Sequence, residues 1–577
     1  MTAVVGNLDH IIIAACLFGI LIIGILSGRF RKMTREKYLL AGRGLNWILI
    51  GAAFLSLALP GCTGKEGQPN ILFIMSDDHT YQGIGAYDDP RYSDLDITPT
   101  IDRLAGEGML FTNVFCTNSI CTPSRATILT GQYNHINQVR DLYDPLPPER
   151  QYLPIELKKA GYETAVVGKW HLRESPESFD YYAVFPGQGK YHDPVLYASD
   201  SGDLKEIRFD SRLSREVRIK EYRGHSSDVV TDISLDWLKN KRNKDKPFFL
   251  MHQFKAPHDM FENAERYDEL YENVDFPMPG TAYEARWGSV ATRGHNDSLV
   301  RYIGASLGNR NDLRNMGKDI GIDQALPAEE YRKQAYNQYM KRYFRCVKGV
   351  DDNIQRILDY LEEEGILENT IIIYTSDQGL FLGEHDFIDK RWMYEESLRM
   401  PLLIRYPKMI QAASKNSWII NNTDLAPTIL ELAGAQTPLY MQGKSFVAAL
   451  KGEEKPQGWR TAHYYRYWMH MAHKMNNPAH FGIRTDRYKL IFFYGTDFIK
   501  TGVEKNDGNR FRADTPVAWE LYDLENDPYE KVNIYEQMKG GAEVKELKTM
   551  LLDIRNELGD TDEDFPHILY RIHSNWN

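Results

Sequence analysis

"NILFIMSDD", residues 70–78, is a short apolar run that stops at two aspartates, Asp77 and Asp78. A run of this length bounded by polar residues is typical of a buried strand. The pattern recurs in three further segments: "YETAVVGKWHL" (162–172), "PFFLMHQFKAPH" (247–258) and "NTIIIYTSDQG" (369–379). Each predicted strand therefore ends in side chains that could carry out chemistry.

Segments with helical periodicity separate these strands: "PTIDRLAGEGM" (99–109), "LPIELKKAG" (153–161) and "DNIQRILDYLEEEG" (352–365). This alternation predicts an α/β fold, with a large, mostly parallel sheet between two layers of helices. Ligands of such sheets bind outside the carboxyl ends of the strands. One polar cluster after a strand usually closes a turn, but four in the same position indicate a functional site at that edge.

The composition is that of a globular protein, with 42% hydrophobic and 26% charged residues among 577. A formal net charge of −11 argues against broad binding to nucleic acid. If the substrate is anionic, basic residues must therefore gather in one pocket. The five cysteines (16, 62, 116, 121 and 346) show neither zinc-site spacing nor a disulfide framework.

The first 69 residues differ from the rest. Two apolar runs, 11–27 and 47–59, enclose a basic loop, which predicts a membrane hairpin with both ends outside the cytoplasm. "FLSLALPGC" resembles a bacterial lipoprotein signal ending at Cys62, and "TREKYLLAGRGLNWILIGAAF" resembles the start of a sodium/solute symporter. Alternatively, Cys62 is an ordinary residue of a second transmembrane helix. Either interpretation predicts an exported, membrane-attached protein in the periplasm or on the surface of a bacterium.

Asp77, Asp78, Asp377 and Gln378 offer only oxygen ligands. Hard oxygen donors favour Ca²⁺ or Mg²⁺ over zinc or copper. Calcium is preferred because it tolerates irregular geometry. Adjacent carboxylates would repel one another without a cation, so a metal would relieve that cost.

"CTPSRATILTG", residues 121–131, places Cys121 at an expected helix start. Pro123 suits a first helical turn, and the free N–H groups there, with Arg125, favour negative charge at position 121. We therefore expect this setting to depress the pKa of an unmodified thiol, which makes a thiolate nucleophile the chemistry to exclude. No Cys-His-Asn pattern supports one, and hard cations are poor partners for sulfur.

The run from Cys121 to Arg125 followed by "ATILTG" resembles the signature of the type I sulfatases, as do "NILFIMSDD", "TPTIDRLAGEG", "GYETAVVGKWHL", "KAPH" and "TSDQGLFLGEHDFIDKRWMYEESLRMPLLIRYP". The resemblance covers roughly residues 70–407. It implies the alkaline-phosphatase-like fold and a cysteine that a maturation enzyme converts to formylglycine. It also implies the metal ligands Asp77, Asp78, Cys121, Asp377 and Gln378. The family often has Asn or His where this chain has Gln378, whose longer side chain carries the same carbonyl oxygen.

The resemblance also implies catalytic roles. One hydroxyl of the hydrated aldehyde attacks sulfur, with Arg125 favouring its ionised form and Asp377 placed to accept its proton. His258 is the first candidate for the acid that protonates the leaving alcohol, and Lys390 is the second. His171 would remove the proton that releases sulfate, and Lys169 and Lys390 would hold the sulfate oxygens.

Residues 70–440 are expected to form the catalytic domain, and residues 441–577 a smaller domain. "HFGIRTDRYKLIFFYG" (480–495) and "WELYDLENDPYE" (519–530) predict a small antiparallel sheet, with a terminal helix near 544–559. His385, His480 and Arg484 are candidate substrate contacts, the alternative for each being support of the fold. The stretch 282–328 is expected to be a loop insertion that shapes the cleft.

"FDYYAVFPGQGKYHDP" and "AHYYRYWMHMAHK" resemble the branch that acts on sulfated glycans, including glucosamine-6-sulfatase-like enzymes. The expected function is therefore desulfation of a glycan. Ulvan is slightly preferred over carrageenan or glycosaminoglycan. Two alternatives stay open: a phosphodiesterase or phosphonate hydrolase of the same fold, and a membrane-tethered glycan-binding protein without activity.

Overall fold

The computed structural model describes residues 67–200, 206–210, 215–282, 289, 305–308, 314–499 and 514–576. Gln68–Asn577 form one compact unit. The predicted membrane hairpin, Cys62 and most of the tether after it lie outside the described residues. Within the described part of the chain, no helix combines the length and the apolar character needed to cross a bilayer.

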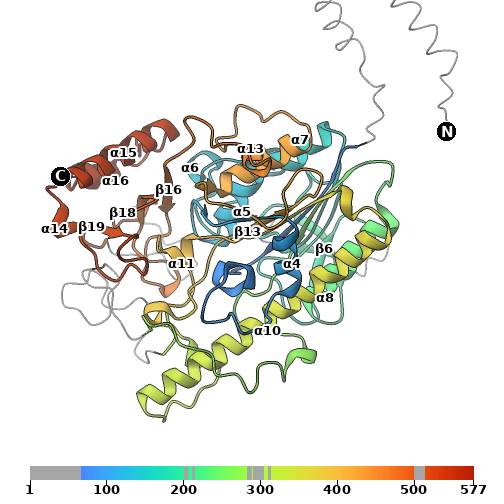
Figure 1. The fold of residues 1–577 in the computed structure, drawn as a ribbon, viewed down its shortest axis with the longest axis horizontal. Helices are drawn as coiled ribbons and strands as arrows, with labels where there is room; N and C mark the ends of the chain where they lie inside the picture. Colours follow the sequence, from blue (N-terminus) through green and yellow to red (C-terminus); the bar gives the residue numbers. More distant parts are fainter. Residues whose placement is uncertain are drawn as a thin grey trace, which may run out of the picture. The chain divides into compact units, whose positions relative to one another are not determined.

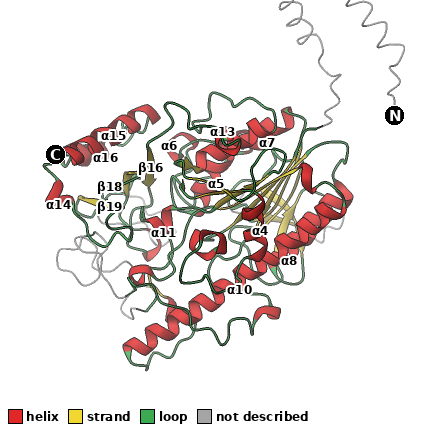
Figure 2. Ribbon diagram, in the orientation of Figure 1, coloured by secondary structure: helices red, strands yellow, loops and turns green. Residues whose placement is uncertain are grey.

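The central sheet has eleven strands in the described residues, in the order β14-β2-β13-β12-β1-β9-β4-β5-β6-β8-β7 (Figure 2). Its five central strands, β12 to β5, are parallel to one another, whereas antiparallel pairs predominate among the flanking strands. The sheet is therefore mixed, with the predicted parallel arrangement confined to its centre. The strand bounds are β1 Asn70–Ser76, β2 Met109–Phe111, β4 Glu163–Gly168, β5 Tyr181–Val184, β6 Val195–Ala198, β7 Glu206–Asp210, β8 Arg215–Glu221, β9 Phe248–Gln253, β12 Thr370–Ser376, β13 Leu402–Arg405 and β14 Ser414–Asn416. The four predicted strands are β1, β4, β9 and β12, all in the parallel core.

Helices cover both faces of the sheet (Figure 1). Alternate residues of β1 point to opposite sides, with Leu72 and Ile74 in one hydrophobic cluster and Ile71 and Phe73 in another. The first cluster includes α4, α8 and α10, and the second includes α5, α7 and α12. The helix bounds are α4 Pro99–Glu107, α5 Cys121–Thr130, α6 Asn134–Asn137, α7 Tyr152–Lys159, α8 Ser226–Asp236, α10 Ala328–Glu363, α12 Leu425–Leu432 and α13 Val447–Leu450. The strands between these layers are buried on both faces, which explains their continuous apolar runs.

A second, antiparallel sheet lies near the C-terminus: β16 (Ala462–Tyr467), β17 (His480–Thr485), β18 (Tyr488–Phe493) and β19 (Ala518–Asp523). The small sheet and the terminal helix α15 (Ala542–Leu558) were predicted, whereas strand β16 was not. The proposed boundary at residue 440 falls inside the one compact unit. Short helices α14 (Tyr535–Met538) and α16 (Pro566–Ser574) complete this region.

A buried ion network joins the second sheet to helix α11 (Glu395–Leu398). Glu395 lies 3.3 Å from Arg484 of β17 and 2.9 Å from Lys489 of β18. Lys489 also lies 2.7 Å from Glu530, and all four side chains are at most 9% exposed. Because α11 follows the segment that carries Lys390, this network fixes that segment relative to the second sheet.

We predict that Lys489→Met lowers the free energy of unfolding by about 3–5 kcal/mol, because it removes the buried cation that Glu395 and Glu530 share. Arg487→Met is the matched control. It removes a pair with Asp523 in which the arginine is 49% exposed, so its cost should be much smaller. Urea denaturation measures both, and equal costs would contradict the proposed importance of the network.

Candidate active site

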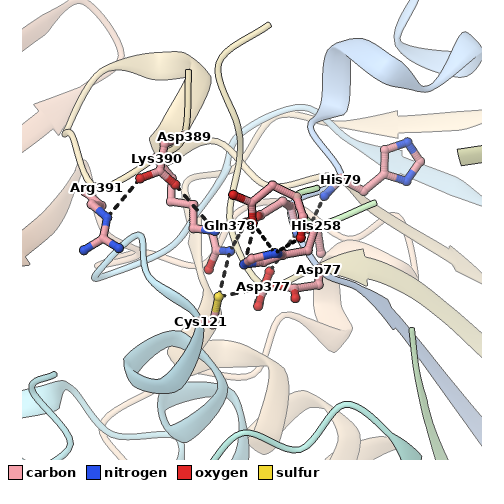
Figure 3. Close-up of polar contacts among 12 residues, drawn as sticks. Asp77, His79, Cys121, His258, Asp377, Gln378, Asp389, Lys390 and Arg391 are labelled. Carbon is pink, nitrogen blue, oxygen red and sulfur yellow. Dashed lines mark hydrogen bonds and ion pairs between the residues drawn. The ribbon is translucent and has the colours of Figure 1, made fainter. Parts of the chain in front are cut away.

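The polar ends of the four predicted strands meet at one edge of the sheet, and Figure 3 shows Asp77, His258 and Asp377, which follow three of them. Strands β1 and β12 pair in parallel with Ser76 opposite Ser376, which brings the following residues, Asp77 and Asp377, together. Strand β9 pairs with both β1 and β4, so their polar ends join the same edge. The predicted convergence is confirmed.

Three carboxylates form the centre of the site. Oxygens of Asp77, Asp78 and Asp377 all lie within 4.8 Å of one another, and the side chains are buried. Burial raises the pKa of Asp78 to about 6. The positive charge of Lys390 lowers this pKa, and the negative charge of Asp377 raises it. The direction of this shift shows that burial and a neighbouring carboxylate disfavour the charged form of Asp78.

Three cations surround this cluster. Arg125 donates through Nε to Asp377 (3.0 Å) and through Nη1 to the Lys169 carbonyl and to Gln253 Oε1 (both 2.7 Å). The Lys169 ammonium contacts Asp77 directly, and Lys390 Nζ lies 2.5 Å from Asp78. Basic side chains from separate segments thus balance the charge of the carboxylates. A protein with a negative net charge needs such a local concentration of basic residues to bind an anion.

Cys121 is the first residue of α5, and its Sγ lies 3.3 Å from Asp77 Oδ1. Ser124 donates its hydroxyl to the Asp377 carbonyl, which ties the helix start to the end of β12. Burial raises the pKa of the Cys121 thiol to about 12, and although Lys390 lowers it, Asp377 raises it further. The expectation of a depressed thiol pKa is therefore wrong, because desolvation and the carboxylates outweigh the helix terminus and Arg125.

The donor set fits a hard divalent cation. Gln378 Oε1 is buried and has no hydrogen-bond partner among the described residues, while its Nε2 donates to Asp78 (2.5 Å). A buried carbonyl oxygen beside three carboxylates is an unmet acceptor that a metal could satisfy. Carboxylate and amide oxygens suit calcium or magnesium.

Two histidines flank the cluster. His258 Nε2 lies 3.7 Å from Asp78, and burial together with Lys390 and Lys169 lowers the pKa of His258 to about 3. The carbonyl of His171 accepts from Thr122 of α5 (2.8 Å). Burial and nearby cations lower the pKa of His171 well below its usual value, and its Nδ1 meets no partner within the described ranges. Both histidines therefore favour the neutral form.

His385, His480 and Arg484 have partners that support the fold. His385 is 2% exposed, with Nε2 3.2 Å from the Tyr529 carbonyl. His480 is fully buried in the second sheet and stacks on Trp392. Arg484 forms the buried pair with Glu395 described above. For these three residues the geometry favours support of the fold over substrate contact, because these contacts hold them inside the second sheet and its surroundings.

Sequence reasoning missed several residues at this edge: Gln253, Asp259, Arg314, Asp389 and Arg391. Asp389 and Arg391 flank Lys390, have positive φ angles of 74° and 86°, and pair with each other at 3.1 Å. Asp259 directly follows His258, and that adjacency was the available signal. It does not reveal whether a side chain folds back onto its neighbour. From the sequence, Lys255 was placed nearer to solvent and given no role; it is in fact buried and lies over the Tyr191 ring.

Comparison with known proteins agrees with this geometry. A family model described as sulfatase matches residues 69–435, and one described as N-sulphoglucosamine sulphohydrolase, C-terminal, matches residues 383–557. The chain is 37% identical to the N-acetylglucosamine-6-O-sulfatase of Bacteroides thetaiotaomicron over 90% of this chain and 92% of that protein. It is 27% identical to human N-acetylglucosamine-6-sulfatase over 69% and 68% of the two chains.

Solved structures give the same result. One, described as a complex with its substrate D-glucosamine-2-N,6-O-disulfate, superposes with a TM-score of 0.71 at 35% identity, covering 86% of this chain and 99% of that one. The phosphonate monoester hydrolase of Agrobacterium radiobacter, at 20% identity and a TM-score of 0.62, covers 85% and 96%, and shows the shared fold alone. The site geometry and the family match point the same way: Cys121 begins a helix beside a carboxylate cluster and three cations. The chain belongs to the sulfatases.

Proposed function

We propose that this sulfatase removes the 6-O-sulfate from glucosamine residues of a sulfated glycan, with a formylglycine made from Cys121 and a bound Ca²⁺. One observation carries the proposal: cations and carboxylates converge on Cys121 in a chain that matches a glucosamine-6-O-sulfatase over nearly its whole length. The raised pKa of the Cys121 thiol argues against an unmodified thiolate as the nucleophile.

The hydrated formylglycine would supply a hydroxyl nucleophile and a second hydroxyl through which sulfate can leave, and the cation would supply positive charge at the sulfate oxygens. The cation would be held by Asp77, Asp78, Asp377 and Gln378, whose oxygens suit calcium. Magnesium is the alternative cation.

The chain's own side chains have distinct tasks. Lys169 and Lys390, which contact Asp77 and Asp78, bind the sulfate oxygens, where negative charge must be stabilised. Arg125 pairs with Asp377 and fixes the direction of that carboxylate. Holding these charges inside a buried pocket strengthens each interaction relative to water.

Two histidines would move protons. His258 Nε2 protonates the oxygen of the leaving alcohol, and His171 accepts the proton whose loss releases sulfate. Burial, Lys390 and Lys169 lower the pKa of His258, whereas Asp259 raises it; the anionic sulfate group would offset the charge of the two lysines and so favour the protonated imidazole. Lys390 is the second candidate for the acid.

Export and membrane attachment through the first 69 residues, and modification by a maturation enzyme, complete the proposal. They rest on the apolar runs, the basic loop and the Cys62 motif of the sequence. The preference for ulvan rests on the sequence resemblance alone, whereas the names of the relatives support a glucosamine sulfate.

We predict that Cys121→Ser lowers kcat by at least about three orders of magnitude, because serine cannot provide the second hydroxyl. The melting temperature and substrate binding should change little. Cys116→Ser is the control: that thiol is also buried, but it contacts the Ser397 carbonyl rather than the carboxylates, so activity should persist. Mass spectrometry of active protein should find formylglycine at position 121, and an intact thiol there would contradict the proposal.

Asp377→Asn should weaken calcium binding by at least about tenfold and lower kcat, because it removes one of three clustered charges. Asp389→Asn removes a carboxylate of the same edge that is outside this cluster, and its calcium affinity should stay within about threefold of the wild type. Calorimetric titration of both variants with calcium tests this. Equal affinities for the wild type and Asp377→Asn would exclude Asp377 as a ligand.

Sulfate release from N-acetylglucosamine 6-sulfate should exceed release from N-acetylgalactosamine 6-sulfate by about 10²-fold or more, because a site that hydrogen-bonds sugar hydroxyls rejects the epimer. Ion chromatography of sulfate, with protein made alongside a maturation enzyme, measures both. Faster desulfation of ulvan oligosaccharides would overturn the glucosamine assignment. Faster hydrolysis of 4-nitrophenyl phosphate than of 4-nitrophenyl sulfate would favour the phosphodiesterase alternative.

A further inference from the structure

The Asp259 carboxylate folds back onto the imidazole of its neighbour, His258. Its Oδ1 lies 2.6 Å from His258 Nδ1, a distance typical of a charge-assisted hydrogen bond. An acceptor at Nδ1 places the proton there and directs the other ring nitrogen to the opposite side. That nitrogen, Nε2, lies 3.7 Å from Asp78 and so faces the carboxylate cluster.

Arg314 holds the other oxygen of the same carboxylate. Its Nη2 donates to Asp259 Oδ2, and both side chains are about three-quarters buried. Burial would raise the pKa of Asp259, but His258 and Arg314 outweigh it and hold that pKa well below its usual range. A carboxylate shared between an arginine and a histidine is thereby kept ionised and fixed in direction.

Arg314 is itself held in place by a short strand pair. It lies in strand β11 (Arg314–Asn315), which pairs with β10 (Ala305–Ser306). Ser306 Oγ donates to Asp386 Oδ2 (2.7 Å), and the backbone N–H of Gly308 donates to Asp386 Oδ1 (2.9 Å). Asp386 precedes Lys390 by four residues. The paired strands β10 and β11 therefore connect the Lys390 segment, through Arg314 and Asp259, to His258.

We infer that Asp259 and Arg314 are positioning residues that orient the His258 imidazole so that Nε2 faces the leaving oxygen of the sulfate ester. The inference rests on the proposed function, in which His258 protonates that oxygen. It also assigns a role to β10 and β11, which lie within the segment 282–328 that was expected to shape the cleft. Asp259 acts through His258 and does not itself contact the reacting atoms.

A purely structural role for Asp259 makes a different prediction. The backbone carbonyl of Asp259 also lies 2.9 Å from His258 Nδ1. If the carboxylate mattered only for packing, this carbonyl would still accept from the imidazole after the carboxylate is replaced. Asp259→Asn preserves the shape and that carbonyl, but its amide cannot serve both Arg314 and Nδ1 as acceptor. The substitution therefore separates the two roles.

Asp259→Asn should lower kcat on N-acetylglucosamine 6-sulfate by roughly 10- to 100-fold, as loss of a residue that orients an active-site group commonly does. KM should stay within about threefold, because sulfate and sugar contacts are untouched. In a His258→Gln background the same substitution should have almost no further effect, since the group it orients is gone. Asp259→Glu should recover part of the rate.

Asp319→Asn is the matched control. Asp319 lies 3.7 Å from Arg314 Nε without contacting His258, so its loss should leave kcat within about twofold. Additive losses in the double variant, an unchanged kcat for Asp259→Asn, or a fall in kcat matched by a fall in melting temperature would overturn the positioning role while the proposed function stands. A wild-type protein that cleaves no sulfate ester would instead overturn both.

Discussion

Repulsion among three buried carboxylates is the constraint on which this structure depends. Asp77, Asp78 and Asp377 place their oxygens within 4.8 Å of one another, where water screens little of their charge. Two of them follow neighbouring strands in register, so the sheet itself enforces the contact. The protein must therefore bring positive charge to this point from elsewhere in the chain. Three segments do so, through Arg125, Lys169 and Lys390.

The cations are useful only if their segments are held firmly. The loop with Lys390 has no regular secondary structure, and it is fixed from two sides. The Glu395 network joins its end to the second sheet, and Asp386 joins its beginning to β10. Buried ion pairs add little net stability by themselves, but they specify one arrangement because a broken pair is costly. In this way the C-terminal sheet, far along the chain, serves the chemistry at the strand ends.

The same burial decides what Cys121 can do. A helix start and Arg125 would favour a thiolate in an exposed site, yet desolvation and the carboxylates raise the thiol pKa instead. The pocket thus suits an oxygen nucleophile beside a hard cation better than sulfur. This is the physical reason why the proposed conversion of the cysteine matters, and why membership of the sulfatase family agrees with the electrostatics of the site.

The sequence by itself determined the α/β fold, the four central strands and the residues at their ends, because buried strands and helices leave periodic apolar patterns. It also indicated the helix at Cys121 through Pro123, and it indicated Lys390 through a family resemblance. Only the tertiary structure decided the direction of the thiol pKa shift, the inward burial of His480 and Arg484, and the contact of Arg314 with Asp259. These depend on desolvation and on contacts between residues far apart in sequence, neither of which has a local pattern.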